Sequence, residues 1–215
     1  MFAFTIDDFL LIFQRFNLAV WPMQIVAYVL GLVAVFFAIK QTGYSIKIIL
    51  AILAFFWLWA GIVFCLLYWA PSYPAAYVLG VLCIVQGVLF LMSLFRSNLS
   101  DCPGTRTHFI VGILFVIYAL AGYPLLGYLV GHVYPKSVPF GLVPCPTAVF
   151  TFGLFLLIHK KFPGYYLAVP VIVAIAGLLA IYKGVYEDIG LFLSGVIGTC
   201  LLVKRYKTVG QGQTA

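Results

Sequence analysis

The sequence has 215 residues, of which 65% are hydrophobic and only 8% are charged, with a formal net charge of +7. Soluble domains usually contain about 25% charged residues, and a globule of this length has too little interior to bury so much apolar surface. Composition therefore excludes a water-soluble fold. It also disfavours nucleic-acid binding, because Lys and Arg collect in the cytoplasmic loops of membrane proteins.

The apolar runs are continuous and about 20 residues long, which is the length that crosses a bilayer as an α-helix. Strands of a transmembrane barrel would instead alternate apolar and polar residues. The predicted fold class is an all-α integral membrane protein, and the lipid bilayer is its first predicted partner.

Residues 1–17 are predicted to form an amphipathic helix that lies in the membrane interface. Asp7 and Asp8 stand where a cleaved signal peptide would carry basic residues, so we expect this segment to be retained. Thr5 and Asp8 have the spacing of a capping box at the start of a helix. Aromatic residues then recur at helical spacing, namely Phe9, Phe13 and Phe16.

Residues 18–207 are interpreted as a single transmembrane domain, and residues 208–215 as a disordered tail. Seven apolar runs are predicted to cross the membrane, at residues 18–39, 46–69, 74–95, 108–130, 145–159, 164–183 and 187–203. The run at 145–159 is short, so a re-entrant segment is the alternative for it.

The distribution of Lys and Arg favours seven crossings. With seven, one side carries Lys40, Lys47, Arg96, Arg106, Lys160, Lys161, Lys204, Arg205 and Lys207, and the other carries Arg15, Lys136 and Lys183. The positive-inside rule then predicts a bacterial inner-membrane protein with its N-terminus outside and its C-terminus in the cytoplasm. Without a crossing at 145–159 this bias is lost.

The first and fifth runs begin with similar steps, Trp21-Pro22 and Cys145-Pro146, and a Gly-Tyr pair precedes the second and sixth runs. This pattern is consistent with a parallel repeat of three spans, one linking span and three spans, because transporters use such repeats. The alternative is the general similarity of any two apolar segments.

Unusual residues gather on the predicted outer side. Prolines in a span free carbonyl groups that must be met by another helix, water or a ligand. Glu187 and Asp188, two of only five acids, can cap the seventh helix or form a cation or proton site, since ionisable groups at membrane depth are usually functional. We expect a pocket for a small solute or ion, lined by Trp21, Gln24, His132, Tyr134, Cys145, Thr147, Glu187 and Asp188, with Gln86 further along the pathway.

A divalent metal is a second hypothesis. His132, Cys145 and Glu187, with Asp188, offer the N, S and O donors that zinc takes. Their spacing matches no compact motif, and catalytic motifs such as His-Glu-x-x-His and Gly-x-Ser-x-Gly do not occur. A small-solute or ion transporter is therefore favoured over an intramembrane metal-binding protein or enzyme. An accessory subunit of a membrane complex, or a homo-oligomer, is also compatible.

Four motifs resemble those of a family of uncharacterised bacterial multi-pass membrane proteins: Trp21-Pro22-Met23-Gln24, Gly131-His132-Val133-Tyr134-Pro135, Pro144-Cys145-Pro146-Thr147 and Glu187-Asp188. The resemblance covers nearly the whole chain and implies the topology and the outer cluster, but no reaction. In layout alone the chain is similar to the small seven-span sugar and amino-acid carriers. Those carry a Pro-Gln step, from which Pro22-Met23-Gln24 and Pro146-Thr147 depart.

Overall fold

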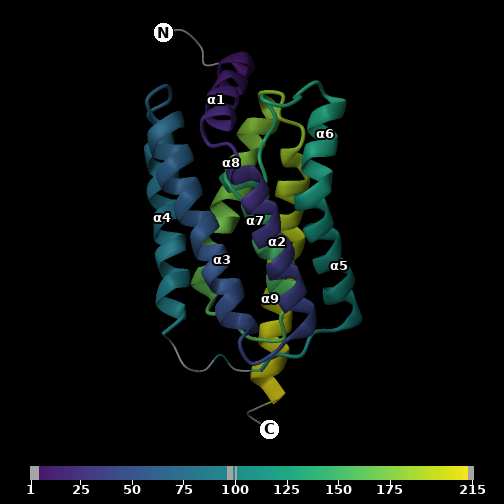
Figure 1. The fold of residues 1–215 in the computed structure, drawn as a ribbon. Coiled ribbons are helices and arrows are strands. Elements are labelled where there is room, and N and C mark those ends of the chain that lie inside the picture. The colour runs from purple at the N-terminus through teal and green to yellow at the C-terminus, as the bar shows by residue number, and fades with distance from the viewer. Residues whose placement is uncertain (1–4, 96–98, 100, 213–215) are drawn as a thin grey trace.

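The apolar runs fold into helices, which bond their backbone groups within the segment as lipid requires. The computed structural model describes residues 5–95, 99 and 101–212. In these residues the helices, several of them continuous with the next, are α1 (Ile6–Ala19), α2 (Met23–Lys40), α3 (Ser45–Trp59), the π-helix η1 (Ala60–Trp69), α4 (Ala76–Ser93), α5 (Arg106–Ile117), the π-helix η2 (Tyr118–Gly122), α6 (Tyr123–Leu129), α7 (Pro144–Leu157), the 3-10 helix η3 (Gly164–Leu167), α8 (Ala168–Tyr182) and α9 (Asp188–Gly212). They form an elongated bundle with α1 at one end and the last turns of α9 at the other (Figure 1).

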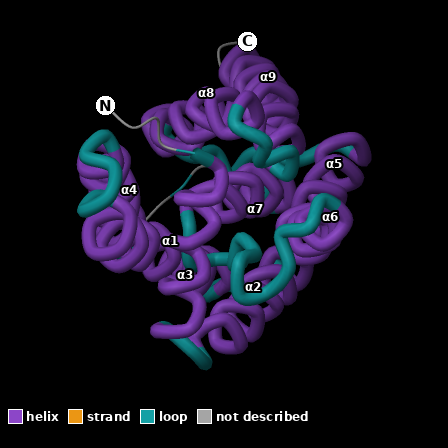
Figure 2. The backbone as a smooth tube through the Cα atoms, turned by 90° about the horizontal axis from the view of Figure 1, so that it is seen from above, coloured by secondary structure: helices purple, strands orange, loops and turns teal. Residues whose placement is uncertain are grey.

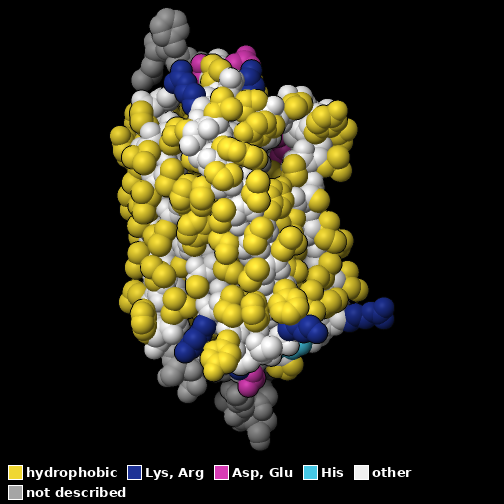
Figure 3. Space-filling view, viewed as in Figure 1, with side chains coloured by type: hydrophobic (Ala, Val, Ile, Leu, Met, Phe, Trp, Pro, Cys, Tyr) yellow, Lys and Arg dark blue, Asp and Glu magenta, His cyan; other side chains and the backbone are white. Residues whose placement is uncertain are grey.

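Six described segments are long and apolar enough to cross a membrane: Met23–Lys40, Ser45–Trp69, Ala76–Ser93, Arg106–Leu129, Gly164–Tyr182 and Asp188–Lys207. Apolar side chains form a broad band around the visible face, and charged side chains gather at its two ends (Figure 3). The all-helical fold is confirmed, and the six long apolar helices are consistent with a membrane protein. The seventh span stays a prediction, because α7 has only 14 residues.

The short helix α7 lies in the middle of the bundle (Figure 2). It packs against α5, α8 and α9 and also contacts α2 and α3. Every one of its residues except Cys145 is buried. At 1.5 Å per residue it extends about 21 Å, less than the hydrocarbon core of about 30 Å. The shortest of the apolar helices predicted to cross the membrane is therefore the one that lies at the core of the bundle, with the longer helices packed around it.

Arg205 of α9 closes the carboxyl end of α7. Its guanidinium donates to the carbonyls of Phe155, Leu156 and Ile158, at 3.4, 3.4 and 2.7 Å, and also to that of Cys102. The last carbonyls of a helix lack partners within it and carry the negative end of its dipole. A buried cation is therefore held where α7 ends.

α9 continues to Gly212. Residues 208–212, predicted as part of a disordered tail, are therefore helical, because each further residue adds one backbone hydrogen bond to a helix that already exists. Residues 213–215 of that tail lie outside the described residues.

α1 begins at the predicted capping box. The Asp8 amide donates to the Thr5 hydroxyl at 3.3 Å, and the Thr5 amide donates to the Asp8 carboxylate at 2.9 Å. Its aromatic face packs on η1, with Phe13 stacked on Phe64 at 5.2 Å between ring centroids. The helix covers one end of the bundle (Figure 1), and its position in the membrane interface stays a prediction.

Candidate functional site at the amino end of α7

The turn between α8 and α9 places the two acids. Gly184 has a φ of +104°, and the amides of Gly184 and Val185 donate to the carbonyls of Ile181 and Ala180, each at 3.0 Å. This is the Schellman pattern, in which a left-handed glycine ends a helix. The chain reverses tightly, so that the adjoining acids Glu187 and Asp188 reach the bundle interior.

The end of α6 uses the same device to place the histidine. Gly131 has a φ of +89°, and the amides of Gly131 and His132 donate to the carbonyls of Tyr128 and Gly127, at 3.2 and 2.7 Å. His132 thereby turns inward, where it is 7% exposed.

His132 and Glu187 form a buried pair. His132 Nδ1 lies 2.7 Å from Glu187 Oε1. A Cβ at Gly127 would stand 3.0 Å from the same oxygen, so the glycine leaves the space that the carboxylate occupies. Glu187 is 0% exposed and its second oxygen, Oε2, has no hydrogen-bond partner in the described residues. A buried carboxylate oxygen without a partner costs free energy, and this one is available for a proton or a ligand.

Asp188 is held by two groups that can each carry a proton. Tyr123 donates its hydroxyl to Asp188 Oδ1, and Cys145 donates its thiol to Oδ2 at 3.5 Å. Cys145 stands in the first turn of α7, between Pro144 and Pro146. The carboxylate thus faces the positive end of the α7 dipole, where negative charge is favoured.

Tyr118 fixes the first turn of α9 from another side. Its hydroxyl donates to the Glu187 carbonyl at 2.6 Å, and a Cβ at Gly190 would overlap its ring. Tyr118 begins the π-helix η2, and such turns within helices often occur at functional sites.

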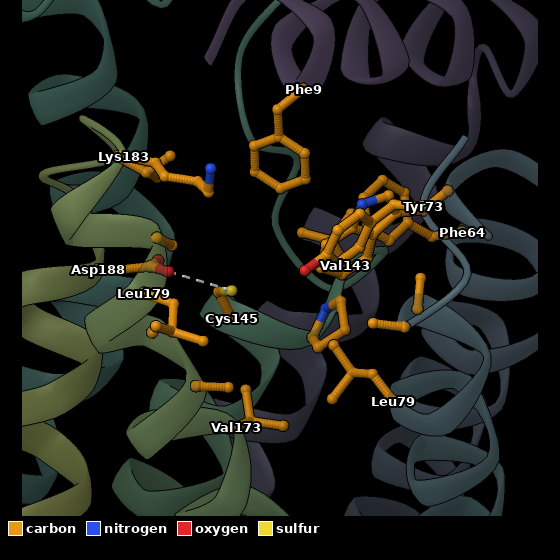
Figure 4. Close-up of a pocket in the computed structure, with 18 of the residues that line it drawn as sticks. Phe9, Phe64, Tyr73, Leu79, Val143, Cys145, Val173, Leu179, Lys183 and Asp188 are labelled. Carbon is orange, nitrogen blue, oxygen red and sulfur yellow. Dashed lines mark hydrogen bonds between the residues drawn. The ribbon is translucent and has the colours of Figure 1, made fainter. Parts of the chain in front are cut away.

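A cavity of about 310 Å³ reaches this cluster. Its floor is the start of α7 and its roof is α1, while α8 and the η1–α4 region form its walls. Figure 4 shows Cys145 joined by a hydrogen bond to Asp188, with Leu179 and Lys183 on the same side as Asp188 and with Phe64 and Tyr73 on the opposite side. The volume lies at the lower end of the range for small-molecule pockets.

The structure brings four predicted residues together at this end of α7: His132, Cys145, Glu187 and Asp188. Only Asp188 and Cys145 of these line the cavity. Among the described residues, no group of three or more His, Cys, Asp or Glu side chains is arranged to hold a metal ion. A divalent metal at His132, Cys145 and Glu187 stays a prediction, which elemental analysis of the purified protein would test.

The other predicted pocket residues lie outside the cavity lining. Trp21 and Tyr134 are 58% and 51% exposed, and Thr147 donates to the Val143 carbonyl one turn back, at 2.7 Å. Gln24 donates to the carbonyl of Asn17, at 2.9 Å. The Asn17 amide in turn donates to the carbonyls of residues 135 and 137, at 2.7 and 2.8 Å, so this polar group ties α1 and α2 to the loop before α7.

Gln86 has a structural partner. Its amide donates to the Tyr166 carbonyl at 3.1 Å, which lies four residues before Pro170. Pro170 has no N–H to offer that carbonyl. Tyr28 does the same for Pro124, donating to the Leu120 carbonyl at 3.1 Å. The carbonyls freed by these two prolines are thus met by neighbouring helices.

Sequence reasoning did not include Tyr118 and Tyr123 among the site residues, and it did not predict the role of Arg205 at the other end of α7. Tyrosines in membrane proteins normally indicate the interface, and Arg205 stands in a basic stretch typical of a cytoplasmic end. The available signal was Gly190, since small residues in membrane helices occur where a neighbouring element packs closely.

No curated protein and no solved structure matches the chain. The profile of a family of unknown function (DUF6064) matches residues 6–213. The match agrees with the uncharacterised family expected from the motifs, and the chain belongs to this family of unknown function.

Proposed function

We propose that the protein is a carrier for a small solute or ion in the bacterial inner membrane, with seven crossings, its N-terminus outside and its C-terminus in the cytoplasm. The observation that carries the proposal is the cavity, which leads to a buried carboxylate at the positive end of a short interior helix. Transporters often bind substrates at the amino ends of such interrupted helices.

The chemistry of the cluster supports coupling to protons. Glu187 and Asp188 are 0% and 1% exposed, and charged groups are costly at such depth unless they serve a function. Their contacts are an imidazole, a phenol and a thiol, each of which can exchange a proton. Proton uptake by these acids would change the charge at the cavity floor and so the affinity for the solute.

Proton flux tests this proposal with the proton itself as the probe. The purified protein is reconstituted in liposomes that contain a pH-sensitive dye, and a potassium diffusion potential drives proton entry. We expect flux above that of protein-free liposomes, and a fall to their level in Asp188→Asn.

The matched control is Asp101→Asn. Asp101 pairs with Lys160 at 2.6 Å at the opposite end of the bundle, and its side chain is 84% exposed. It should leave the flux unchanged. Equal flux in the original protein and Asp188→Asn, or none above the protein-free liposomes, would overturn the proposal.

A further inference from the structure

One side of the cavity faces lipid. Val78 of α4 and Leu179 of α8 both line the cavity, yet they are 66% and 70% exposed. Both helices belong to segments that are apolar and long enough to cross a membrane, so in a bilayer these two side chains would contact lipid tails. Transfer of an ion or a polar group into hydrocarbon without a partner is costly. This side is therefore closed to an ion or a small polar solute.

Another side of the cavity is covered by α1. The first half of this helix contributes Ile6, Phe9 and Phe13 to the lining. Figure 4 shows the ring of Phe9 between the side that carries Lys183 and the side that carries Tyr73. In Figure 1, α1 lies at the end of the bundle opposite the last turns of α9. An ion that approaches the cavity from water at this end therefore meets α1 first.

The last half of α1 is anchored by hydrogen bonds. Asn17 is 1% exposed, and its amide donates to the carbonyls of residues 135 and 137, at 2.7 and 2.8 Å. Gln24 donates to the Asn17 carbonyl at 2.9 Å. Buried hydrogen bonds of this kind are costly to break. The anchor stands beside residues 20–22, which join α1 to α2, and hinges often lie at such ends of elements.

The first half of α1 contacts the cavity rim through apolar side chains. The Phe13 ring stacks on that of Phe64, with 5.2 Å between their centroids. Cγ1 of Ile6 lies 3.9 Å from the position that a Cβ would take at Gly184, in the turn between α8 and α9. Apolar contacts are non-directional, so they can be broken and remade as a helix moves. The capping box satisfies the first turn from within α1, so this half can move as one helical unit.

We propose that α1 is a lid on the cavity, which pivots at Asn17 and admits an ion or a small polar solute when its first turn lifts from the rim. In the structure the lid is closed over Asp188 and Cys145. Lids that close over a site separate it from water, so the same movement would control when Asp188 exchanges protons with water. The inference rests on the proposed carrier function for the entry of solute, though not for the motion of the helix.

Cys145 can report the opening of the lid, because it lines the cavity beneath α1. The protein is placed in lipid nanodiscs and treated with a positively charged methanethiosulfonate, which does not enter hydrocarbon. The peptide that contains Cys145 is followed by mass spectrometry. Ile6→p-benzoylphenylalanine allows the first turn of α1 to be joined by irradiation to the rim near Gly184. We expect labelling of Cys145 before irradiation and its loss afterwards, with the cross-linked peptides identified in the same digest.

The matched control is Leu11→p-benzoylphenylalanine. Leu11 is also on α1, but it is 43% exposed and outside the cavity lining. Irradiation should leave the labelling of Cys145 unchanged in this variant. The proposal would be overturned by labelling that persists in the cross-linked Ile6 variant, or by a lack of labelling of the original protein by the charged reagent. A cross-link from position 6 that does not reach the rim would contradict the closed position of the lid.

A neutral methanethiosulfonate tests the lipid-facing side of the cavity. This reagent dissolves in lipid, so it should reach Cys145 between α4 and α8 and label both variants before and after irradiation. Loss of the neutral label on irradiation would indicate closure of the whole cavity and would overturn the lid.

Proton flux separates this inference from the carrier function. Labelling of Cys145 that stops on cross-linking, in a protein without proton flux, would leave the lid standing and remove the carrier. Flux that continues undiminished in liposomes of the cross-linked Ile6 variant would remove the lid alone.

Discussion

The two ends of α7 differ in how their polar groups are met. At the carboxyl end, one arginine bonds the carbonyls of Phe155, Leu156 and Ile158, and the nearby hollow beside Ile158 measures only about 60 Å³. At the amino end, two acids share contacts with a histidine, a tyrosine and a cysteine, and one oxygen of Glu187 has no partner among the described residues. A cavity of about 310 Å³ reaches that end.

This difference distinguishes a structural contact at the carboxyl end of α7 from a candidate functional site at its amino end. Both charged groups that meet α7 come from α9, Asp188 at its start and Arg205 further along, and each has the sign that the α7 dipole favours. Each end has a buried atom without a partner among the described residues, Glu187 Oε2 at the amino end and Arg205 Nε at the carboxyl end, but only the amino end adjoins a cavity of about 310 Å³. Buried charge alone therefore does not single out a candidate functional end, whereas buried charge beside a cavity does.

Arg205→Met should produce the largest loss of stability. It leaves three carbonyls at the end of α7 without their donor, at about 1–3 kcal/mol for each buried group, or about 5 kcal/mol in total. The free energy of unfolding is measured by titration with sodium dodecyl sulfate in mixed micelles. Lys207→Met, an exposed neighbour on α9, should unfold like the original protein, and an equal loss in both variants would contradict the structural role of Arg205.

The His132–Glu187 pair is expected to give the next largest effect. His132→Leu removes the hydrogen-bond partner of Glu187 Oε1 and leaves a buried polar group unpaired, which should cost about 3 kcal/mol. A double-mutant cycle with Glu187→Leu should give a coupling energy of about 1–3 kcal/mol. The same cycle on Asp101 and Lys160 should give only about 0.2–1 kcal/mol, because that pair is at the surface. Similar couplings at the two ends would contradict the contrast between them.

Gln86 provides a sharper test, because it asks whether a buried polar side chain stabilises the fold or lines a transport pathway. Gln86→Leu should cost about 1–2 kcal/mol, because the Tyr166 carbonyl loses its donor. In a Pro170→Ala background the backbone N–H at position 170 can serve that carbonyl, so the same substitution should cost much less. An equal cost in both backgrounds, measured by detergent unfolding, would contradict this structural role and would favour the predicted pathway role of Gln86.

The smallest expected effect is on the stability of the first turn of α1, the helix that covers the cavity. Hydrogen bonds from the Thr5 amide and hydroxyl hold the pKa of Asp8 below its ordinary value of 3.8. The capping contribution is therefore fully present above pH 3.8 and is lost as the pH falls through the lowered pKa. Amide hydrogen exchange in the first turn of α1, corrected for intrinsic rates, should accelerate in that acid range. Asp8→Asn should remove this pH dependence, and a transition that persists in Asp8→Asn would contradict the assignment.

Much of the fold could be predicted because its signals are local. Hydropathy located the six long spans, and the Thr5–Asp8 spacing gave the first turn of α1. The Gly-rich reversals that place His132 and Glu187 are also local. The His132–Glu187 contact is not local, because the two residues are 55 positions apart in the sequence and they meet only where the end of α6 approaches the turn before α9.

The predicted pocket and the cavity overlap only at Cys145 and Asp188, for a related reason. Trp21, Gln24 and Tyr134 were all predicted to lie on the outer side of the membrane, but the sequence does not show which of these side chains faces the interior of the bundle. The cavity lining instead comes from apolar positions such as Leu79 and Leu179, which hydropathy cannot distinguish from any lipid-facing leucine. Arg205 was counted among the basic residues of the cytoplasmic side. Its burial depends on where α7 ends in space, which the sequence does not show.

Residues of α9 contact both ends of α7, and this has a consequence for synthesis at the ribosome. α7 is translated before α9, so its short apolar segment leaves the translocon before the residues that meet its two ends exist. We expect α7 to integrate stably only after Arg205 has emerged, which makes membrane insertion of this protein a late and concerted step. A chain stopped after Gly184 should accordingly be degraded in cells, whereas one stopped after Lys207 should accumulate.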